Sequence, residues 1–269
     1  MDYRAKHVVV TGGASGVGAA LLELLAELGC RQVTVLDLNT PAGPHSRFIQ
    51  TNLADPCALD AAIDQIDAPV DVLFNNAGIA DTAPRDRVIA VNLFAPLRLT
   101  EGLLPKMGAG AAVVNTASVA GMSWAKRLGE IQELLALDSR AAMVAWLDGR
   151  ELGVDTYSFT KEALIVWTMR SASALVARGI RINSVCPNPI DTPLLADFRQ
   201  TIGEAGLKFA MDRAGGVVSP RQVAQLLAFF GSDLAAMVSG QNIDIDYGFR
   251  ASIVTGTVDT SAVRASAGR

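Results

Sequence analysis

Tyr157 and Lys161 are the residues of this sequence best suited to acid–base chemistry. Four positions apart on a helix, their side chains share one face, a turn from each other. A free tyrosine titrates near pH ~10, and a neighbouring cation favours the phenolate and lowers that pKa. Lowering it by about 3 units takes roughly 4 kcal/mol, which a lysine and a bound cationic ligand together can supply. Because the spacing Y-x-x-x-K also occurs by chance, its meaning depends on the rest of the chain.

A glycine-rich turn lies near the start of the chain. An apolar run at 7–11 predicts a buried strand, and leucines at helical spacing follow the sequence TGGASGVG at 11–18. In such a strand–turn–helix unit, Gly12, Gly16 and Gly18 let a pyrophosphate approach the backbone and the N–H groups that begin the helix. The turn therefore predicts a dinucleotide site, and a glycine-rich turn without a ligand is the less favoured alternative.

Asp37 ends the next apolar run and lies 19 positions after the last of these glycines. An acid about 20 positions on is expected to bind the hydroxyl groups of the adenosine ribose. The same carboxylate repels a 2′-phosphate, and Ala14, Ser15, Leu38 and Asn39 offer no compensating cation. The sequence therefore predicts NAD rather than NADP.

Two polar residues stand where a ligand site is expected. Ser118 follows a predicted strand, and the carboxyl ends of parallel strands are where such folds bind ligands. Asn92 lies inside a long helical pattern, where its side chain competes for backbone hydrogen bonds. We therefore expect a local helix distortion and a water site at Asn92, although a surface asparagine fits the same pattern.

Apolar runs and helical patterns alternate along the chain, as in an α/β fold. Strands are expected at 7–11, 32–38, 47–51, 70–74, 111–116, 181–186 and 241–246. Helices are expected after residue 18 and at 56–66, 85–107, 156–178 and 220–230. No repeat, linker or second domain is visible, so residues 1–269 are expected to form one domain.

Composition narrows the function further. The 269 residues are 50% apolar, which is ample for a large core, and a net charge of −4 does not suggest a nucleic-acid surface. Mean hydropathy is +0.31, yet no apolar run reaches the ~18 residues of a membrane span. The three cysteines and two histidines are not spaced along the sequence as the ligands of a metal site would be. We expect a cytoplasmic protein with no metal, no membrane partner and reduced cysteines.

Taken in order, these motifs resemble the short-chain dehydrogenase/reductase family over nearly the whole chain. The matching pieces are the glycine turn, NNAG at 75–78, Asn92, Ser118 and Tyr157-x-x-x-Lys161. The resemblance implies a doubly wound, Rossmann-type sheet of about seven parallel strands. It implies that Tyr157 is the general acid/base, that Lys161 binds the nicotinamide ribose and lowers the tyrosine pKa, that Ser118 holds the substrate oxygen, and that Asn92 holds a relay water. It implies a cofactor-binding set of Gly12, Ser15, Gly16, Val17, Gly18, Asp37, Leu38, Asn52, Leu53, Asn76, Ala77, Gly78, Tyr157, Lys161, Pro187, Ile190 and Thr192.

The sequence departs from the family pattern at three places. Asn52 stands where an acid near the adenine is frequent, and Pro187-Asn188 replaces the usual Pro-Gly, for which asparagine tolerates a positive φ. The segment 124–153 is an insertion before Tyr157, similar to that of members resembling 3α-hydroxysteroid dehydrogenase/carbonyl reductase. Its pattern predicts two short helices with one apolar side. It is interpreted as a wall or lid for a bulky apolar substrate, as a change in subunit contacts, or as mere cover for the core.

The segment 191–216 is expected to be the substrate loop. Its apolar residues, Leu194, Leu195, Phe198, Ile202, Leu207, Phe209 and Met211, suit a lid over a nonpolar ligand. We therefore expect an NAD-dependent oxidoreductase that interconverts an alcohol and its carbonyl on an apolar ring: a hydroxysteroid or terpenoid first, an aromatic alcohol second. The alternatives are an NADH-sensing regulator without turnover and an epimerase or lyase of the same fold. Relatives often pair through the helices that carry Asn92 and Tyr157, so a homo-oligomer is expected, a dimer before a tetramer.

Overall fold

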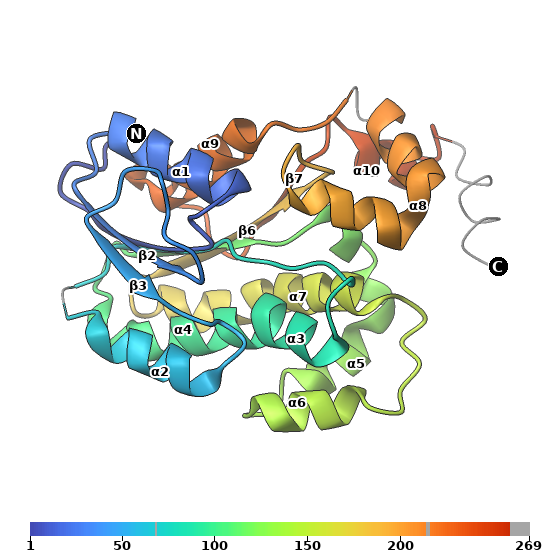
Figure 1. The fold of residues 1–269 in the computed structure, drawn as a ribbon, viewed down its shortest axis with the longest axis horizontal. Coiled ribbons are helices and arrows are strands. Elements are labelled where there is room, and N and C mark those ends of the chain that lie inside the picture. The colour runs from blue at the N-terminus through green and yellow to red at the C-terminus, as the bar shows by residue number, and fades with distance from the viewer. Residues whose placement is uncertain (68, 214–215, 259–269) are drawn as a thin grey trace.

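Seven parallel strands form one sheet in the order β3-β2-β1-β4-β5-β6-β7 (Figure 1). The computed structural model describes residues 1–67, 69–213 and 216–258, with the side chains of 202–206, 209–210 and 212–213 left out. The strands are β1 (His7–Thr11), β2 (Gln32–Asp37), β3 (Arg47–Gln50), β4 (Val72–Asn75), β5 (Ala112–Thr116), β6 (Arg181–Pro187) and β7 (Asn242–Ile245). The chain order reverses between β1 and β4, which opens a ligand crevice at the carboxyl ends of these strands. The expected doubly wound sheet is confirmed.

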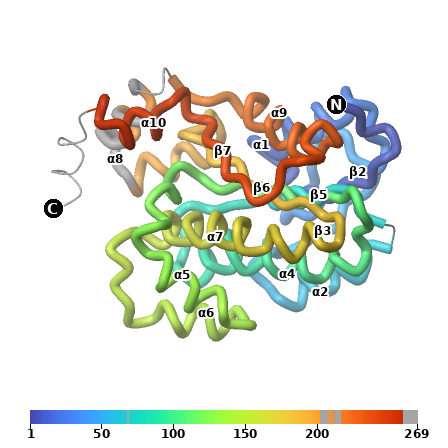
Figure 2. Tube along the Cα trace, turned by 180° about the vertical axis from the view of Figure 1, so that it is seen from behind, coloured from blue at the N-terminus to red at the C-terminus, as the bar shows by residue number. Residues whose placement is uncertain are grey.

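Helices cover both faces of the sheet, as Figures 1 and 2 show from opposite sides. One layer contains α1 (Gly16–Glu27) and α9 (Pro220–Gly231), and the other contains α2 (Pro56–Gln65), α3 (Arg85–Ile89), α4 (Ala95–Leu103) and α7 (Thr156–Val176). Because both faces are covered, each strand can be apolar throughout. In β1, Val8 and Val10 pack on the α1 side, while Val9 packs on the other.

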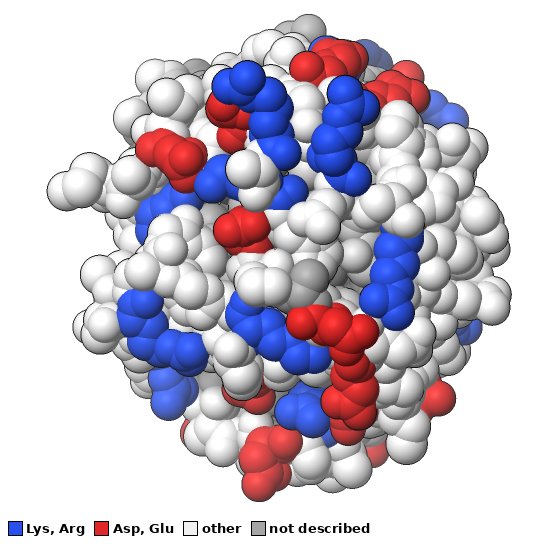
Figure 3. Space-filling model, turned by 90° about the vertical axis from the view of Figure 1, so that its left-hand side faces the viewer, with Lys and Arg blue, Asp and Glu red and all other residues white. Residues whose placement is uncertain are grey.

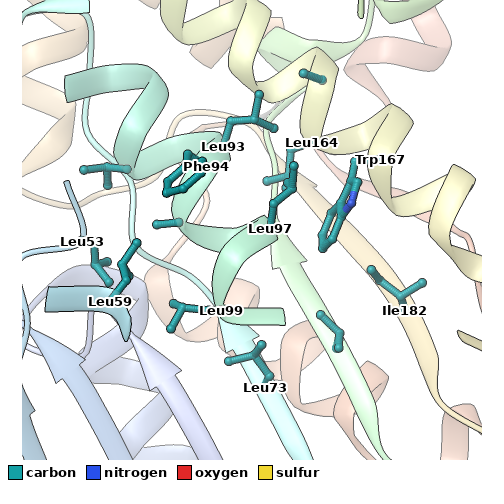
Figure 4. Packing of buried hydrophobic residues seen from close by; sticks show 14 of the residues in the cluster. Leu53, Leu59, Leu73, Leu93, Phe94, Leu97, Leu99, Leu164, Trp167 and Ile182 are labelled. Atoms are coloured by element: carbon teal, nitrogen blue, oxygen red, sulfur yellow. The ribbon is translucent and has the colours of Figure 1, made fainter. Parts of the chain in front are cut away.

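The larger core lies between the sheet and the layer of α2, α4 and α7 (Figure 4). Leu97 and Leu99 of α4 and Leu164 and Trp167 of α7 contribute to it, together with Ile182 of β6. Residues of α7 are buried on all sides from Phe159 to Thr168, so this helix lies inside the fold rather than on its surface. The catalytic pair predicted from the sequence is thus carried by a buried helix.

The expected distortion at Asn92 is confirmed. Helices α3 and α4 are joined by a π-helical turn, Ala90–Phe94, and the 3₁₀ turn Leu104–Lys106 ends the stretch. This helical stretch of 22 residues, Arg85–Lys106, is apolar enough to cross a membrane by composition, with a mean hydropathy of 1.2. However, 72% of its apolar window is buried inside the protein, which is what a core helix of a globular fold also shows.

The insertion forms the predicted helical hairpin. It consists of a 3₁₀ turn, Trp124–Arg127, followed by α5 (Leu128–Leu134) and α6 (Arg140–Leu147). Its apolar side joins the larger core through buried Ile131, Leu134, Met143 and Leu147. The Trp146 and Phe159 rings are stacked 6.0 Å apart, which ties α6 to α7.

The expected substrate loop contains one helix, α8 (Leu194–Arg213), and the chain after β7 begins α10 (Phe249–Val254). The side chains of Ile202 and Phe209, and residues 259–269 of the tail, lie outside the described residues. Figure 3 shows one face of the molecule, on which acidic and basic side chains are interspersed. A nucleic-acid surface instead gathers basic side chains in a patch or stripe.

Candidate active site

A cavity of about 450 Å³ opens at the carboxyl ends of the strands. It brings together segments from the whole chain: the glycine turn, the ends of β2, β4, β5 and β6, the start of α7, and one face of α8. Its walls include the following residues predicted from the sequence: Gly12, Ser15, Gly16, Val17, Asp37, Leu38, Asn52, Leu53, Asn76, Ala77, Gly78, Ser118, Tyr157, Lys161, Pro187, Ile190 and Thr192. Gly18 and Asn92 are not in the wall, and both lie directly behind it.

The side chains of Tyr157 and Ser118 meet inside this cavity. Ser118 follows β5 and its Oγ also accepts a hydrogen bond from the Ala120 N–H at 3.1 Å, so its position is set by the following turn. Burial raises the pKa of Tyr157 to about 12, and the hydrogen bond to Ser118 opposes that rise. Within the protein alone, desolvation of the phenolate outweighs the other contributions. The lowering expected from the sequence also needs the charge of a bound cationic ligand, and it stays a prediction.

Lys161 is buried, with 3% of its surface exposed. Its Nζ donates to the Thr116 carbonyl at 2.8 Å and lies 5.6 Å from the centre of the Tyr157 ring. Burial lowers the pKa of Lys161 to about 8. The lysine is therefore held in place by the end of β5, on the same side of the cavity as the tyrosine.

Asn92 acts on the cavity through the loop after β4. Its Oδ1 accepts from the Ile79 N–H and its Nδ2 donates to the Ile79 carbonyl, both at 2.9 Å. These two bonds explain the π-helical turn. The Asn92 side chain takes its hydrogen-bond partners from the loop after β4 and not from the backbone of its own helix. A Cβ placed on Gly78 would lie 3.5 Å from both Asn92 Oδ1 and Lys161 Nζ. The amide and the ammonium thus converge behind Gly78.

The glycine turn has the shape of a cradle for a dinucleotide. Gly12 and Gly16 have positive φ values of 73° and 55°, which a glycine adopts at no steric cost. A Cβ at Gly18 would lie only 1.8 Å from the Gly12 carbonyl oxygen, so helix α1 packs under the turn only because residue 18 has no side chain. The residues present therefore fit a pyrophosphate at the start of α1.

Asp37 stands at the far end of the same cavity. Its carboxylate accepts hydrogen bonds from the Ala14 N–H at 2.9 Å and from the Asn39 N–H at 3.0 Å. Leu38, Asn52 and Leu53 line the wall beside it. An acid, an apolar wall and an amide in this part of the cavity fit a ribose and an adenine ring.

Asn188 takes the place of the expected glycine without a left-handed backbone. Among the described non-glycine residues only Tyr247 has a positive φ, so the tolerance of asparagine for that region is not needed here. The Asn188 N–H donates to the Ile245 carbonyl at 2.9 Å, which joins the end of β6 to β7. Beyond it, Ile190 pairs with Val218, and the Thr192 N–H donates to the Ile190 carbonyl at 2.8 Å.

The substrate side of the cavity is apolar. Leu194, Phe198 and Thr201 line it from one face of α8, and the Phe198 ring meets the Tyr157 ring edge-on, with centroids 5.0 Å apart. No residue of the insertion 124–153 is among the lining residues of the described structure. The apolar side of the insertion instead packs on the larger core, which favours the interpretation of the insertion as cover for the core.

Sequence reasoning missed several residues of the site, among them Arg87, Phe249 and Asp81. Arg87 and Phe249 line the cavity; Arg87 lies one helical turn before Val91, another lining residue, a spacing that could have revealed it. Asp81 is not among the residues that line the cavity. Its carboxylate nevertheless accepts hydrogen bonds from the Thr156 and Tyr157 N–H groups, at 2.9 and 3.1 Å. Burial and the neighbouring Asp155 raise the pKa of Asp81. It holds the first turn of α7, and its partners lie 75 positions or more away, so nothing local in the sequence marks it.

Known proteins resemble this chain over almost its full length. Residues 6–128 match the protein family described as "short chain dehydrogenase", and residues 128–250 match the family described as "Enoyl-(Acyl carrier protein) reductase". A coniferyl-alcohol dehydrogenase from a Pseudomonas species is 32% identical over 256 residues, covering 94% of this chain and 100% of that protein. The chain belongs to the short-chain dehydrogenase/reductase family. It is thus an oxidoreductase with a site for a nicotinamide nucleotide.

Two further members of the family are similar. The cis-4-hydroxycyclohexanecarboxylate dehydrogenase of Sinomonas cyclohexanicum is 30% identical over 276 residues, covering 93% of this chain and 98% of that protein. The crystal structure of the 3-alpha-hydroxysteroid dehydrogenase from Pseudomonas sp. B-0831, complexed with NADH, superimposes with a TM-score of 0.80 at 28% identity. That match covers 94% of this chain and all of the other.

Proposed function

We propose that this protein is a cytoplasmic, NAD-dependent dehydrogenase that interconverts an alcohol and its carbonyl on an apolar, ring-bearing substrate. The observation that carries the proposal is that Tyr157, Ser118 and Lys161 meet in the cavity that Asp37 also lines, with Lys161 Nζ 5.6 Å from the centre of the tyrosine ring. A regulator that only senses NADH needs the glycine turn and Asp37, but has no use for this arrangement.

Each residue of the site has a part in the proposed reaction. When bound, the nicotinamide supplies the hydride acceptor or donor. Tyr157 takes the hydroxyl proton during oxidation and returns it to the alkoxide oxygen during reduction. Ser118 donates a hydrogen bond to the same oxygen, and Lys161 binds the ribose and favours the phenolate with its positive charge. Asn92, held through Ile79, places a water that passes the proton toward solvent.

The cofactor proposed is NAD. Asp37 is positioned to accept hydrogen bonds from two ribose hydroxyls, and its negative charge opposes a 2′-phosphate. Its carboxylate already faces the backbone N–H of Ala14 on the glycine turn, so its orientation is set. The similar hydroxysteroid dehydrogenase is complexed with NADH, which agrees with this choice.

The substrate class follows from the wall opposite the cofactor cradle. Leu194, Phe198 and Phe249 present apolar surface beside Tyr157 and Ser118. The similar enzymes act on coniferyl alcohol, a hydroxycyclohexanecarboxylate and a 3-alpha-hydroxysteroid, all of which carry a ring. We therefore place hydroxysteroids and terpenoid alcohols first, and aromatic alcohols second.

The test is NADH formation by the purified protein with a panel of hydroxysteroids, terpenoid alcohols and aromatic alcohols. NAD and NADP are compared in parallel, and Tyr157→Phe is the control. Turnover with NAD that is lost in Tyr157→Phe supports the proposal. Tight NADH binding without turnover on any alcohol would instead favour the regulator.

A further inference from the structure

The start of the insertion makes a buried ion pair with the residue that follows Lys161. The Arg127 guanidinium donates to the Glu162 carboxylate through two of its nitrogens: Nε lies 2.7 Å from Oε2, and Nη2 donates to Oε1. The Glu162 side chain is 0% exposed and that of Arg127 is 15% exposed. Two-point binding of this kind sets both the distance and the angle between the two side chains.

A second contact lies between the same two segments. A Cβ placed on Gly121 would be 2.9 Å from the carbonyl carbon of Lys161 and 3.0 Å from the nitrogen of Glu162. The turn after Ser118 therefore lies directly against the backbone of α7, at the peptide that joins the lysine to the glutamate. No side chain fits between them.

These contacts join two stretches that carry the reacting groups. Ser118, Gly121 and Arg127 follow one another along the chain after β5, and each meets α7: Ser118 at Tyr157, Gly121 at the Lys161–Glu162 peptide, and Arg127 at Glu162. A rotation or shift of α7 that moved Tyr157 away from Ser118 would also break the other two contacts.

Arg85 holds the other end of the insertion in a similar way. Its guanidinium donates to the Leu147 and Arg150 carbonyls, at 2.9 and 3.3 Å, and to Thr156 Oγ1 at the first turn of α7, at 3.3 Å. The hairpin is thus attached to α7 at both of its ends, while its own residues stay out of the cavity wall.

We propose that the insertion is a brace for the catalytic helix, and that Arg127 and Glu162 are positioning residues that hold Lys161 and Tyr157 in register with Ser118. This inference rests on the proposed function. Stability alone is a poor explanation of the pair, because replacing a buried ion pair by apolar side chains is often neutral or stabilising. What two apolar side chains cannot reproduce is the two-point geometry.

The decisive variants separate stability from position. Arg127→Met and Glu162→Gln each leave a buried charge or amide without its partner, so both are expected to lower the melting temperature. The double variant Arg127→Met/Glu162→Leu removes both charges and is expected to recover that stability. Arg98→Met, which removes the exposed pair of Arg98 with Asp60, is the matched control.

Kinetics with NAD and the best alcohol give the first readout. In the double variant we expect kcat to fall by about 100-fold, as for a reacting group moved by ~1 Å. Arg98→Met is expected to keep the wild-type kcat. A double variant that recovers both its melting temperature and its kcat would show that the pair is only structural and would overturn the proposal.

A second readout does not need turnover. The chain has five lysines, namely Lys6, Lys106, Lys126, Lys161 and Lys208, so ¹³Cε-lysine NMR with a Lys161→Met reference resolves the titration of Lys161. If the brace holds this lysine in its buried place, its pKa rises toward the ordinary ~10.4 in the double variant and stays unchanged in Arg98→Met. An unchanged titration of Lys161 in the double variant would overturn the proposed brace, whether or not the wild type turns over an alcohol. A wild type that turns over no alcohol would refute the proposed function separately.

Discussion

Asp37 Oδ2 accepts a hydrogen bond from the Ala14 N–H at 2.9 Å, and this contact joins the end of β2 to the glycine turn. The carboxylate is therefore oriented before any ribose arrives, so the proposed preference for NAD can be tested at this one side chain. Since Leu38 and Asn39 follow it in the sequence, no cation is next to it along the chain to attract a 2′-phosphate.

Asp37→Ser is expected to shift the preference from NAD toward NADP. Loss of the charge-assisted bonds to the ribose costs about 1.5–3 kcal/mol, which is roughly 10- to 100-fold in the affinity for NAD. Affinity for NADP is expected to rise, because the repulsion of the 2′-phosphate is gone. Fluorescence titration with NADH and NADPH measures both effects, and an unchanged ratio would contradict the assignment of Asp37.

The rate of carbonyl reduction is expected to fall as pH rises through about 8. Reduction needs Tyr157 as a phenol and Lys161 as a cation. The pKa of Tyr157, raised to about 12, keeps the phenol protonated, whereas the pKa of Lys161, lowered to about 8, means that its charge is lost above that pH. Lys161→Arg keeps its charge and is expected to lose the fall near pH 8, whatever its residual rate.

Much of the cofactor side of the site could be predicted from the sequence because its determinants are local. The order of Gly12, Gly16 and Gly18 followed by Asp37 reflects one strand–turn–helix–strand unit, whose geometry any such unit repeats. The distortion at Asn92 was equally predictable, since a mid-helix asparagine must find partners for its amide.

The parts that escaped prediction depend on contacts between distant segments. Asp81 meets Thr156 across 75 positions, and Phe249 reaches the cavity only after β7 has been placed. The role of the insertion stayed open for the same reason: an apolar helical side fits a substrate or a neighbouring helix equally well, and only the fold shows that it packs on α7. Desolvation of Tyr157 is also invisible in a sequence, and it opposes the lowering of the pKa that is expected from Lys161 and a bound cation.

Asp81→Ala is expected to destabilise the protein and lower activity. The carboxylate satisfies two N–H groups in the first turn of α7, where a negative charge is favoured by the helix dipole. Losing it is expected to cost about 1–2 kcal/mol of unfolding free energy, measured by urea denaturation. Asp81→Asn keeps an acceptor and should recover part of this loss. Equal stability of all three proteins would refute the capping role.

Phe198→Ala is expected to weaken the binding of ring-bearing substrates. The Phe198 ring meets Tyr157 edge-on at 5.0 Å, so a substrate ring beside Tyr157 packs against it. An aromatic contact contributes about 0.5–1.5 kcal/mol beyond its buried area, so KM should rise by roughly 10-fold or more. The KM for a short aliphatic alcohol serves as control and is expected to change little. A similar rise for both substrates would argue against a ring-binding role.

A dimer is expected in solution. Residues Phe159 to Thr168 of α7 are buried within a single chain, so this part of the helix is not available to a second copy. Apolar side chains remain exposed near β7 at the edge of the sheet: Leu234 is 67% exposed, Met237 96% and Ile243 39%. Light scattering should give twice the 28.2 kDa of one chain, and Met237→Glu should shift the protein toward the monomer. A stable tetramer in dilute solution would contradict this prediction, because a second interface would then have to form despite the covered face of α7.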